Sequence, residues 1–185
     1  MPTQNELTKN YSGIFGNKVV LKNRNGKSIM TIPLQKGIKG PSDKQVDARL
    51  LFKQATEYGN KVLEDPVKLA AYAAKPRKGL NPYLMAVTDF LTPPVVRQID
   101  ASAYRGNPGD RLNVVAIDDF AVAGVTVKIT GPNGALVEEG PCIEGQYTGT
   151  YQYIATVNLP NLTGVTITAT AIDKPGHKGE LSITL

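Results

Sequence analysis

The sequence predicts two parts of different structural class: an α+β N-terminal module, made of a β-hairpin and three helices, followed by an all-β sandwich. Helical patterning precedes Pro93-Pro94, and short alternating runs follow it. The charge changes sign at the same place. Residues 1–95 hold 15 Lys+Arg and 7 Asp+Glu, a net of +8, whereas residues 96–185 hold 6 and 9, a net of −3. We therefore predict domains of residues 1–93 and 94–185.

The hairpin is predicted by two apolar runs, 19–24 and 27–32, on either side of Asn25-Gly26. Asn-Gly suits a two-residue type I′ turn, because both central positions need positive φ. This turn places Arg24 opposite Lys27 and Leu21 opposite Met30. One face of the hairpin is then apolar and is expected to lie on a core: Val19, Leu21, Met30 and Ile32.

Three helices are predicted from their start signals. Ser42 and Gln45 have the spacing of a capping box, and Asp65-Pro66 and Asn81-Pro82 each combine an N-cap residue with Pro at the first helical position. Apolar residues at spacings of three and four predict one buried stripe on the first helix: Val46, Leu50, Leu51, Ala55, Tyr58 and Val62.

Eight cations of the N-terminal half lie mainly on the hairpin and on loops, where they could converge on phosphates. A solvated basic surface is the alternative explanation. The candidate nucleic-acid-binding residues are Lys22, Arg24, Lys27, Lys36, Lys39, Lys75, Arg77 and Lys78.

After the double proline, turn residues separate seven short runs, which is typical of an antiparallel sandwich. The predicted strands are 95–99, 112–117, 125–130, 135–139, 148–157, 165–171 and 179–185. Alternation predicts two inner faces. One carries Tyr147, Tyr151, Tyr153, Ala155 and Val157, and the other carries Val165, Ile167, Ala169 and Ala171.

Three segments of this half resemble bacterial immunoglobulin-like domains: Gly109-Asp110 with Val114-Val115-Ala116, the run from Asp118-Asp119-Phe120 to Val127, and the run from Gly164 to Asp173-Lys174-Pro175-Gly176. In that family the last motif usually ends in Asn, where this chain has His177. The resemblance implies a spacer or recognition module without catalytic residues. The whole chain resembles bacterial two-part proteins with a basic helical front and an Ig-like back.

Reactive side chains are few, since the chain has one Cys and one His. This excludes a disulfide framework and Cys-rich zinc sites. His177 follows Pro175-Gly176 and is expected to be an exposed turn residue, whereas Cys142 is expected to be buried or half-buried. No phosphate-binding glycine loop, nucleophile elbow or H-E-x-x-H motif occurs. We therefore predict that the protein is not an enzyme.

A calcium site is a further hypothesis. Asp118, Asp119 and Asp173 fall at predicted strand ends, where they could meet at one pole of the sandwich and supply oxygen ligands to Ca²⁺. Turn formation is the alternative explanation for these residues. No other cofactor is predicted.

The sequence thus favours a non-enzymatic interaction or structural protein, with a protein partner or assembly as its target. The alternative is a nucleic-acid-binding protein that uses the basic hairpin and loops. No apolar run is long enough to span a bilayer, and the N-terminus lacks a secretory signal. This predicts a cytoplasmic protein, or an extracellular one if another route exports it; the oligomeric state is left open.

Overall fold

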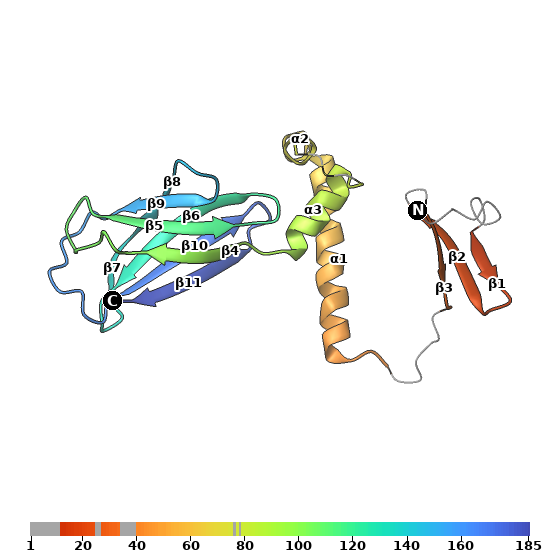
Figure 1. The fold of residues 1–185 in the computed structure, drawn as a ribbon, viewed down its shortest axis with the longest axis horizontal. Coiled ribbons are helices and arrows are strands. Elements are labelled where there is room, and N and C mark those ends of the chain that lie inside the picture. Colours follow the sequence, from red (N-terminus) through yellow and green to blue (C-terminus); the bar gives the residue numbers. More distant parts are fainter. Residues whose placement is uncertain (1–11, 25–26, 34–39, 76, 78) are drawn as a thin grey trace, which may run out of the picture. The chain divides into compact units, whose positions relative to one another are not determined.

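The computed structural model describes residues 12–24, 27–33, 40–75, 77 and 79–185. The chain divides into two compact units, residues 1–48 and 49–185. Figure 1 shows the helices and the three sheets that these residues form. None of the helices in the described ranges is long and apolar enough to cross a membrane.

The first unit contains a three-stranded antiparallel sheet, β1 (Gly13–Phe15), β2 (Val19–Arg24) and β3 (Lys27–Thr31). The hairpin register is the predicted one, because Arg24 pairs with Lys27 and Leu21 with Met30. Strand β1 was not predicted, since three residues are too few to show alternation. The Asn25-Gly26 turn lies outside the described residues.

The prediction that the apolar face of this hairpin lies on a core is wrong for most of its residues. Leu21 is buried, but Met30 is 65% exposed and Ile32 is 81% exposed. A sheet buries a face only against a second layer. The described residues of the first unit supply only the single three-stranded sheet and the start of a helix, so this face stays largely uncovered.

The three predicted helices are α1 (Asp43–Glu64), α2 (Pro66–Ala73) and α3 (Pro82–Leu91), and their start signals are confirmed. The Ser42 backbone N–H donates to Gln45 Oε1 at 3.1 Å, which is one half of the capping box. Asp65 Oδ1 accepts from two backbone N–H groups of α2, and Asn81 Oδ1 accepts from one of α3.

The apolar stripe of α1 is only half buried, which corrects the prediction. Ala55 and Val62 are fully buried, but Val46, Leu50 and Leu51 are 49%, 55% and 44% exposed. The reason is that α1 contacts α3 through its C-terminal half, where Tyr58 stacks with Phe90. The buried cluster around these contacts joins all three helices and the loop after β5: Val62, Tyr72, Met85 and Ala86, with Tyr58, Leu80 and Phe120 packed against them.

The second unit also contains two four-stranded antiparallel sheets. One has the order β11-β10-β6-β7 and the other β4-β5-β9-β8. The strands of the first are β6 (Val122–Thr130), β7 (Leu136–Pro141), β10 (Thr166–Asp173) and β11 (Lys178–Thr184). The strands of the second are β4 (Val95–Asp100), β5 (Arg111–Ile117), β8 (Ile143–Glu144) and β9 (Thr150–Ile154).

All seven predicted strands are present, and the β-sandwich character is confirmed. Side chains from both sheets form one buried cluster, as expected for two sheets packed face to face. The inner face predicted from Val165 to Ala171 is fully buried. Strand β9 is shorter than predicted, however, so Tyr147 falls in the loop before it and is 72% exposed.

The predicted change of structure at the double proline is confirmed, because α3 ends at Leu91 and β4 begins at Val95. Pro94 is fully buried, and the Gly179 backbone of β11 packs against the Pro94 carbonyl group. The division into compact units falls elsewhere, between residues 48 and 49, so α2 and α3 belong to the same unit as the sandwich. The predicted domain boundary after residue 93 stays a prediction.

Candidate functional site

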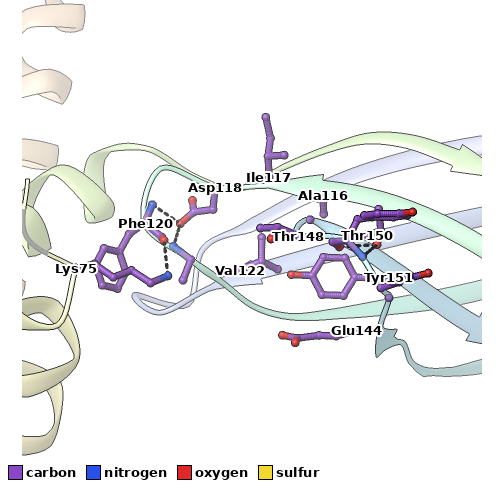
Figure 2. Close-up of a pocket in the computed structure, with 15 residues that line it drawn as sticks. Lys75, Ala116, Ile117, Asp118, Phe120, Val122, Glu144, Thr148, Thr150 and Tyr151 are labelled. Carbon is purple, nitrogen blue, oxygen red and sulfur yellow. Dashed lines mark hydrogen bonds between the residues drawn. The ribbon is translucent and has the colours of Figure 1, made fainter.

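A pocket of about 490 Å³ lies at one end of the sandwich. Its walls are the loop from β5 to β6, the loop from β8 to β9, and Lys75 from the segment after α2. Figure 2 shows Lys75 beside Phe120 on one side of the pocket, with Thr148, Thr150 and Tyr151 on the other. The polar and aromatic side chains of the lining are Lys75, Asp118, Phe120, Glu144, Gln146, Tyr147, Thr148, Thr150 and Tyr151.

Both loops are shaped by hydrogen bonds from short side chains to their own backbone. Asp118 Oδ2 accepts from the backbone N–H groups of Phe120 and Ala121, at 3.0 and 2.7 Å. The Thr150 hydroxyl donates to the Tyr147 carbonyl group at 2.6 Å. Asp, Asn, Ser and Thr form such turns because their oxygen atoms reach backbone groups two or three residues away. The pocket is therefore bounded by two ordered turns.

The segment after α2 is bound to the loop from β5 to β6. Arg77 Nη1 donates to both carboxylate oxygens of Asp119 at 3.0 Å, and Arg77 Nη2 donates to the Asp119 carbonyl group. Lys75 Nζ lies 5.2 Å from the centroid of the Phe120 ring and donates to the Phe120 carbonyl group at 3.4 Å. Arg77 therefore joins the segment after α2 to this loop through one ion pair and one hydrogen bond to the backbone.

Three groups of the lining have the chemistry to bind a partner. The Glu144 carboxylate and the Tyr147 ring are both exposed. The Tyr151 side chain is buried at 8% exposure, and its pKa is raised by desolvation and by the charge of Glu144. Tyr151 therefore stays a neutral phenol at physiological pH, while Glu144 is an anionic contact open to solvent.

Behind the pocket lies a buried cluster of carboxyl and phenol groups. Asp89 of α3 is 0% exposed, and its Oδ2 accepts a hydrogen bond from the Tyr72 hydroxyl at 2.5 Å. The Tyr72 and Tyr58 hydroxyl oxygens are 3.0 Å apart. Desolvation raises the pKa of Asp89 to about 7, with the Tyr72 hydrogen bond opposing the shift and Asp118 and Asp173 adding to it. Asp118 therefore belongs both to the pocket lining and to this cluster.

His177 lies in a turn as expected, but the expectation that it is exposed is wrong. The imidazole is half-buried: its Nδ1 lies 3.1 Å from Asp173 Oδ2, and its ring meets Phe90 of α3 edge-on at 4.5 Å between centroids. Asp173 Oδ1 also accepts from the Gly176 and His177 backbone N–H groups. The turn is thus fixed by Asp173, and the ring is positioned because α3 packs against it.

The predicted nucleic-acid-binding residues have different environments. Lys36, Lys39 and Lys78 lie outside the described residues, as does the side chain of Arg24. Lys22 and Lys27 are exposed on the hairpin of the first unit.

The other two predicted phosphate contacts, Lys75 and Arg77, belong to the second unit. Both are engaged with the loop from β5 to β6, and Arg77 is paired with a carboxylate. Nucleic-acid binding stays a prediction.

The three predicted calcium ligands also have protein partners. Asp118 and Asp173 accept from turn amides, and Asp119 pairs with Arg77. Within the described ranges, no group of three or more His, Cys, Asp or Glu side chains is arranged to hold a metal ion. Asp118 and Asp173 do come near a common neighbour, which is Asp89. The calcium hypothesis stays a prediction.

The structure also shows the surroundings of one thiol and one further carboxyl group. Cys142 is half-buried as predicted, and desolvation raises the pKa of its thiol to about 12. Glu138 is buried in β7, where its Oε2 accepts from the Tyr153 hydroxyl and from the Thr156 backbone N–H and hydroxyl groups.

Asp89, Tyr72 and Glu138 were not among the functional residues predicted from the sequence. Of these three residues, Asp89 has a weak signal in the sequence. It lies on the same helical stretch as the apolar residues Met85 and Ala86, and a buried carboxyl group needs a partner. Nothing in the local sequence names Tyr72 as that partner, because the contact joins two helices across 17 residues.

No family model matches the chain. No curated protein matches it either. Among solved structures, the chain is similar to CopC from Methylosinus trichosporium OB3b, with 17% identity and a TM-score of 0.34 over 48% of this chain and 87% of that one. It is also similar to the pullulanase SAP of Group B Streptococcus, with 16% identity and a TM-score of 0.30 over 49% of this chain and 10% of that one. TM-scores this low support no argument about the chain. The assignment of the β-sandwich therefore depends on the strand pairing, and the candidate site depends on the residues that line it.

Proposed function

We propose that the protein is a non-enzymatic binding protein whose sandwich recognises a basic segment of a partner protein through the pocket between the two loops. The observation that carries this proposal is that the Glu144 carboxylate and the Tyr147 ring are exposed in the lining of one pocket. Arg77 pairs with Asp119 and so joins the segment after α2 to the loop from β5 to β6 beside this pocket.

The chemistry of the pocket favours a lysine or arginine side chain of the partner. A carboxylate pairs with such a cation, and the face of a tyrosine ring attracts it through its quadrupole. The ammonium group of Lys75 contacts the Phe120 ring and carbonyl group. It is therefore engaged away from Glu144 and Tyr147. Exposed tyrosine is also common among the residues that dominate binding energy at protein interfaces.

The reactive groups support a binding role over catalysis. His177 contacts Asp173 and Phe90, and neither of these is a nucleophile for which the imidazole could act as base. A thiol with a pKa of about 12 stays protonated at physiological pH, and the thiolate is the nucleophilic form of cysteine. Neither His177 nor Cys142 belongs to the pocket lining.

The test is a binding titration with two synthetic peptides of equal length, one carrying lysine and arginine and the other glutamate at the same positions. Tyrosine fluorescence can report binding, because the chain has 8 Tyr and no Trp. We expect the basic peptide to bind and the acidic peptide not to bind. Glu144→Gln and Tyr147→Ala should each weaken the affinity by about 5- to 30-fold, which corresponds to about 1–2 kcal/mol.

The matched control is Glu139→Gln, which removes an exposed carboxylate of β7 that is not part of the lining. This variant should bind the basic peptide like the unaltered protein. Equal binding of both peptides, or equal losses in the Glu139 and Glu144 variants, would contradict the pocket as the recognition site.

Nucleic-acid binding is the second candidate, and the hairpin register favours it. Lys22 pairs with Ile29 and Arg24 with Lys27, so these three cationic positions share one face of the sheet. Such a basic ribbon is suited to contacts with phosphates.

A further inference from the structure

The buried cluster behind the pocket contains two carboxyl oxygens that lack a donor. Asp89 Oδ1 and Asp118 Oδ1 are both buried, and neither has a hydrogen-bond partner among the described residues. Asp89 is fully buried, and its other oxygen already accepts from Tyr72. The other oxygen of Asp118 already accepts from two backbone N–H groups. Each side chain therefore has one oxygen left to satisfy.

The two carboxyl groups are close to each other. The Tyr72 hydroxyl donates to Asp89, the Tyr72 and Phe120 ring centroids are 4.4 Å apart, and the Phe120 backbone N–H donates to Asp118. The neighbouring Asp118 side chain also raises the pKa of Asp89. Two facing carboxylates without a cation repel each other, and leaving a buried acceptor unsatisfied costs about 1–3 kcal/mol. One proton removes both costs, because it turns one group into a donor for the other.

We propose that Asp89 and Asp118 share one proton, which closes a hydrogen bond between α3 and the loop from β5 to β6 and fastens the helices to the sandwich in a pH-dependent way. The inference concerns the inside of the second unit and does not rest on the proposed partner site. A failed peptide titration would leave it unaffected.

The remaining groups around Asp89 act in opposite directions. The Tyr72 hydroxyl of α2 donates to Asp89, which favours the carboxylate form, and Tyr58 of α1 contacts the Tyr72 hydroxyl. Asp173 at the end of β10 adds negative charge, and His177 is the group that pairs with it. The nearby cations contact other groups. Lys75 and Lys174 lie over the Phe120 ring, and Arg77 pairs with Asp119.

A bound cation is the competing explanation, and the donor set favours a proton. Asp89 and Asp118 offer one free oxygen each, whereas Ca²⁺ takes six to eight oxygen ligands. The described residues supply no group of three ligands around them.

The sign of the pH effect follows from the two states of the chain. The pKa of Asp89 is about 7 in the folded protein and 3.8 in its ordinary state. Folding therefore takes up a proton between these values. The shared proton stabilises the folded state fully below about pH 4, and this stabilisation is lost as the pH rises through 7. Across this window the folding equilibrium constant should fall by up to about tenfold per pH unit.

The experiment measures unfolding by denaturant at several pH values from 5 to 8.5, for the full chain and for Asp89→Asn. Asparagine keeps an oxygen that accepts from Tyr72 and supplies an N–H donor to Asp118 in place of the proton. We expect the free energy of unfolding of the unaltered protein to fall as the pH rises from 5 to 7. In Asp89→Asn this fall should be mostly absent. Asp119→Asn is the matched control, since Asp119 is adjacent in sequence but pairs with Arg77. The free energy of unfolding of Asp119→Asn should fall with pH as it does in the unaltered protein.

A second measurement covers the case in which Asp89→Asn fails to fold. Carbon-13 NMR of the aspartate carboxyl groups in the unaltered protein should show one group that titrates near pH 7. Titration of every aspartate near pH 4 would overturn the proposal, as would an unchanged pH dependence in Asp89→Asn. Stabilisation by a divalent cation, reversed by a chelator and missing in Asp89→Asn, would assign the two oxygens to a metal ion instead.

Discussion

Buried acids are the residues on which this structure depends most at the level of single side chains. Asp89 joins α3 to α2, Asp173 fixes a turn, and Glu138 joins β7 to the end of β9. A buried polar group is costly unless it is hydrogen-bonded, and each of these three carboxyl groups has at least one hydrogen-bond donor. Their removal should therefore cost more than the loss of an apolar contact of similar size.

Glu138→Ala tests this for the sandwich. The substitution leaves the Tyr153 hydroxyl and the Thr156 amide and hydroxyl without their acceptor. An unsatisfied buried donor costs about 1–3 kcal/mol, so we expect the free energy of unfolding to fall by about 3 kcal/mol, as measured by denaturant titration. Glu139→Ala is the control, because Glu139 is exposed on the same strand, and it should change stability by less than about 0.5 kcal/mol. Equal effects of the two substitutions would contradict the role of Glu138.

At the level of helices and strands, close backbone approach determines how the elements pack. Gly59 of α1 lies where a Cβ would be 2.8–2.9 Å from the Tyr83 ring and the Val87 side chain of α3. Gly179 of β11 lies where a Cβ would collide with the Pro94 carbonyl group. A side chain can move away, but a backbone carbonyl group next to a buried proline cannot. The second contact is therefore the stricter requirement for glycine.

Gly179→Ala should separate β11 from the start of β4 and lower stability by more than about 2 kcal/mol. Thermal unfolding followed by circular dichroism would measure this as a lower Tm. Gly124→Ala is the matched control, because Gly124 lies in β6 of the same sheet and a Cβ there would meet nothing within 4 Å. A Tm equal in both variants would show that the strands can move apart at no cost.

At the level of the whole chain, the charge asymmetry is the feature that bears on partners. The net of +8 in residues 1–95 includes cations that have acidic partners, such as Arg77, and others that are exposed, such as Lys22 and Lys27. Only cations that release counterions from phosphates produce a steep salt dependence. Salt dependence therefore distinguishes a phosphate-binding surface from a solvated one.

If the hairpin binds nucleic acid, random duplex DNA should bind at low salt and dissociate as salt increases, with a slope set by the number of phosphate contacts. A double Lys22→Ala, Lys27→Ala variant should reduce that slope by about two. Arg77→Ala should leave it unchanged, because Arg77 is already paired with Asp119. Fluorescence anisotropy with a labelled duplex would measure this. Absence of binding at low salt would remove the nucleic-acid candidate.

Local sequence signals predicted the three helices and most of the strands, but not the short strands β1 and β8. The N-cap residues Asp65 and Asn81, the Asn-Gly pairing register and the alternation from Val165 to Ala171 all act over a few residues, so they can be identified without knowing the fold. The candidate site was predicted only in part. Asp118 and Asp173 were named, and turn formation, the alternative to calcium binding, is the role that their hydrogen bonds show. The Tyr147 ring was assigned to a strand face instead of a loop.

Burial and pairing between distant residues depended on tertiary packing. The faces of the hairpin and of the first half of α1 are apolar, yet neither is covered, because amphipathic pattern shows which face could be buried and not whether a layer lies against it. The contacts of Asp89 with Tyr72 and of His177 with Phe90 join residues that are far apart along the chain. Periodicity and capping fix the elements of this protein because both act locally. Asp89 and Glu138 acquire their partners only in the folded chain, because Tyr72 and Tyr153 lie on other elements.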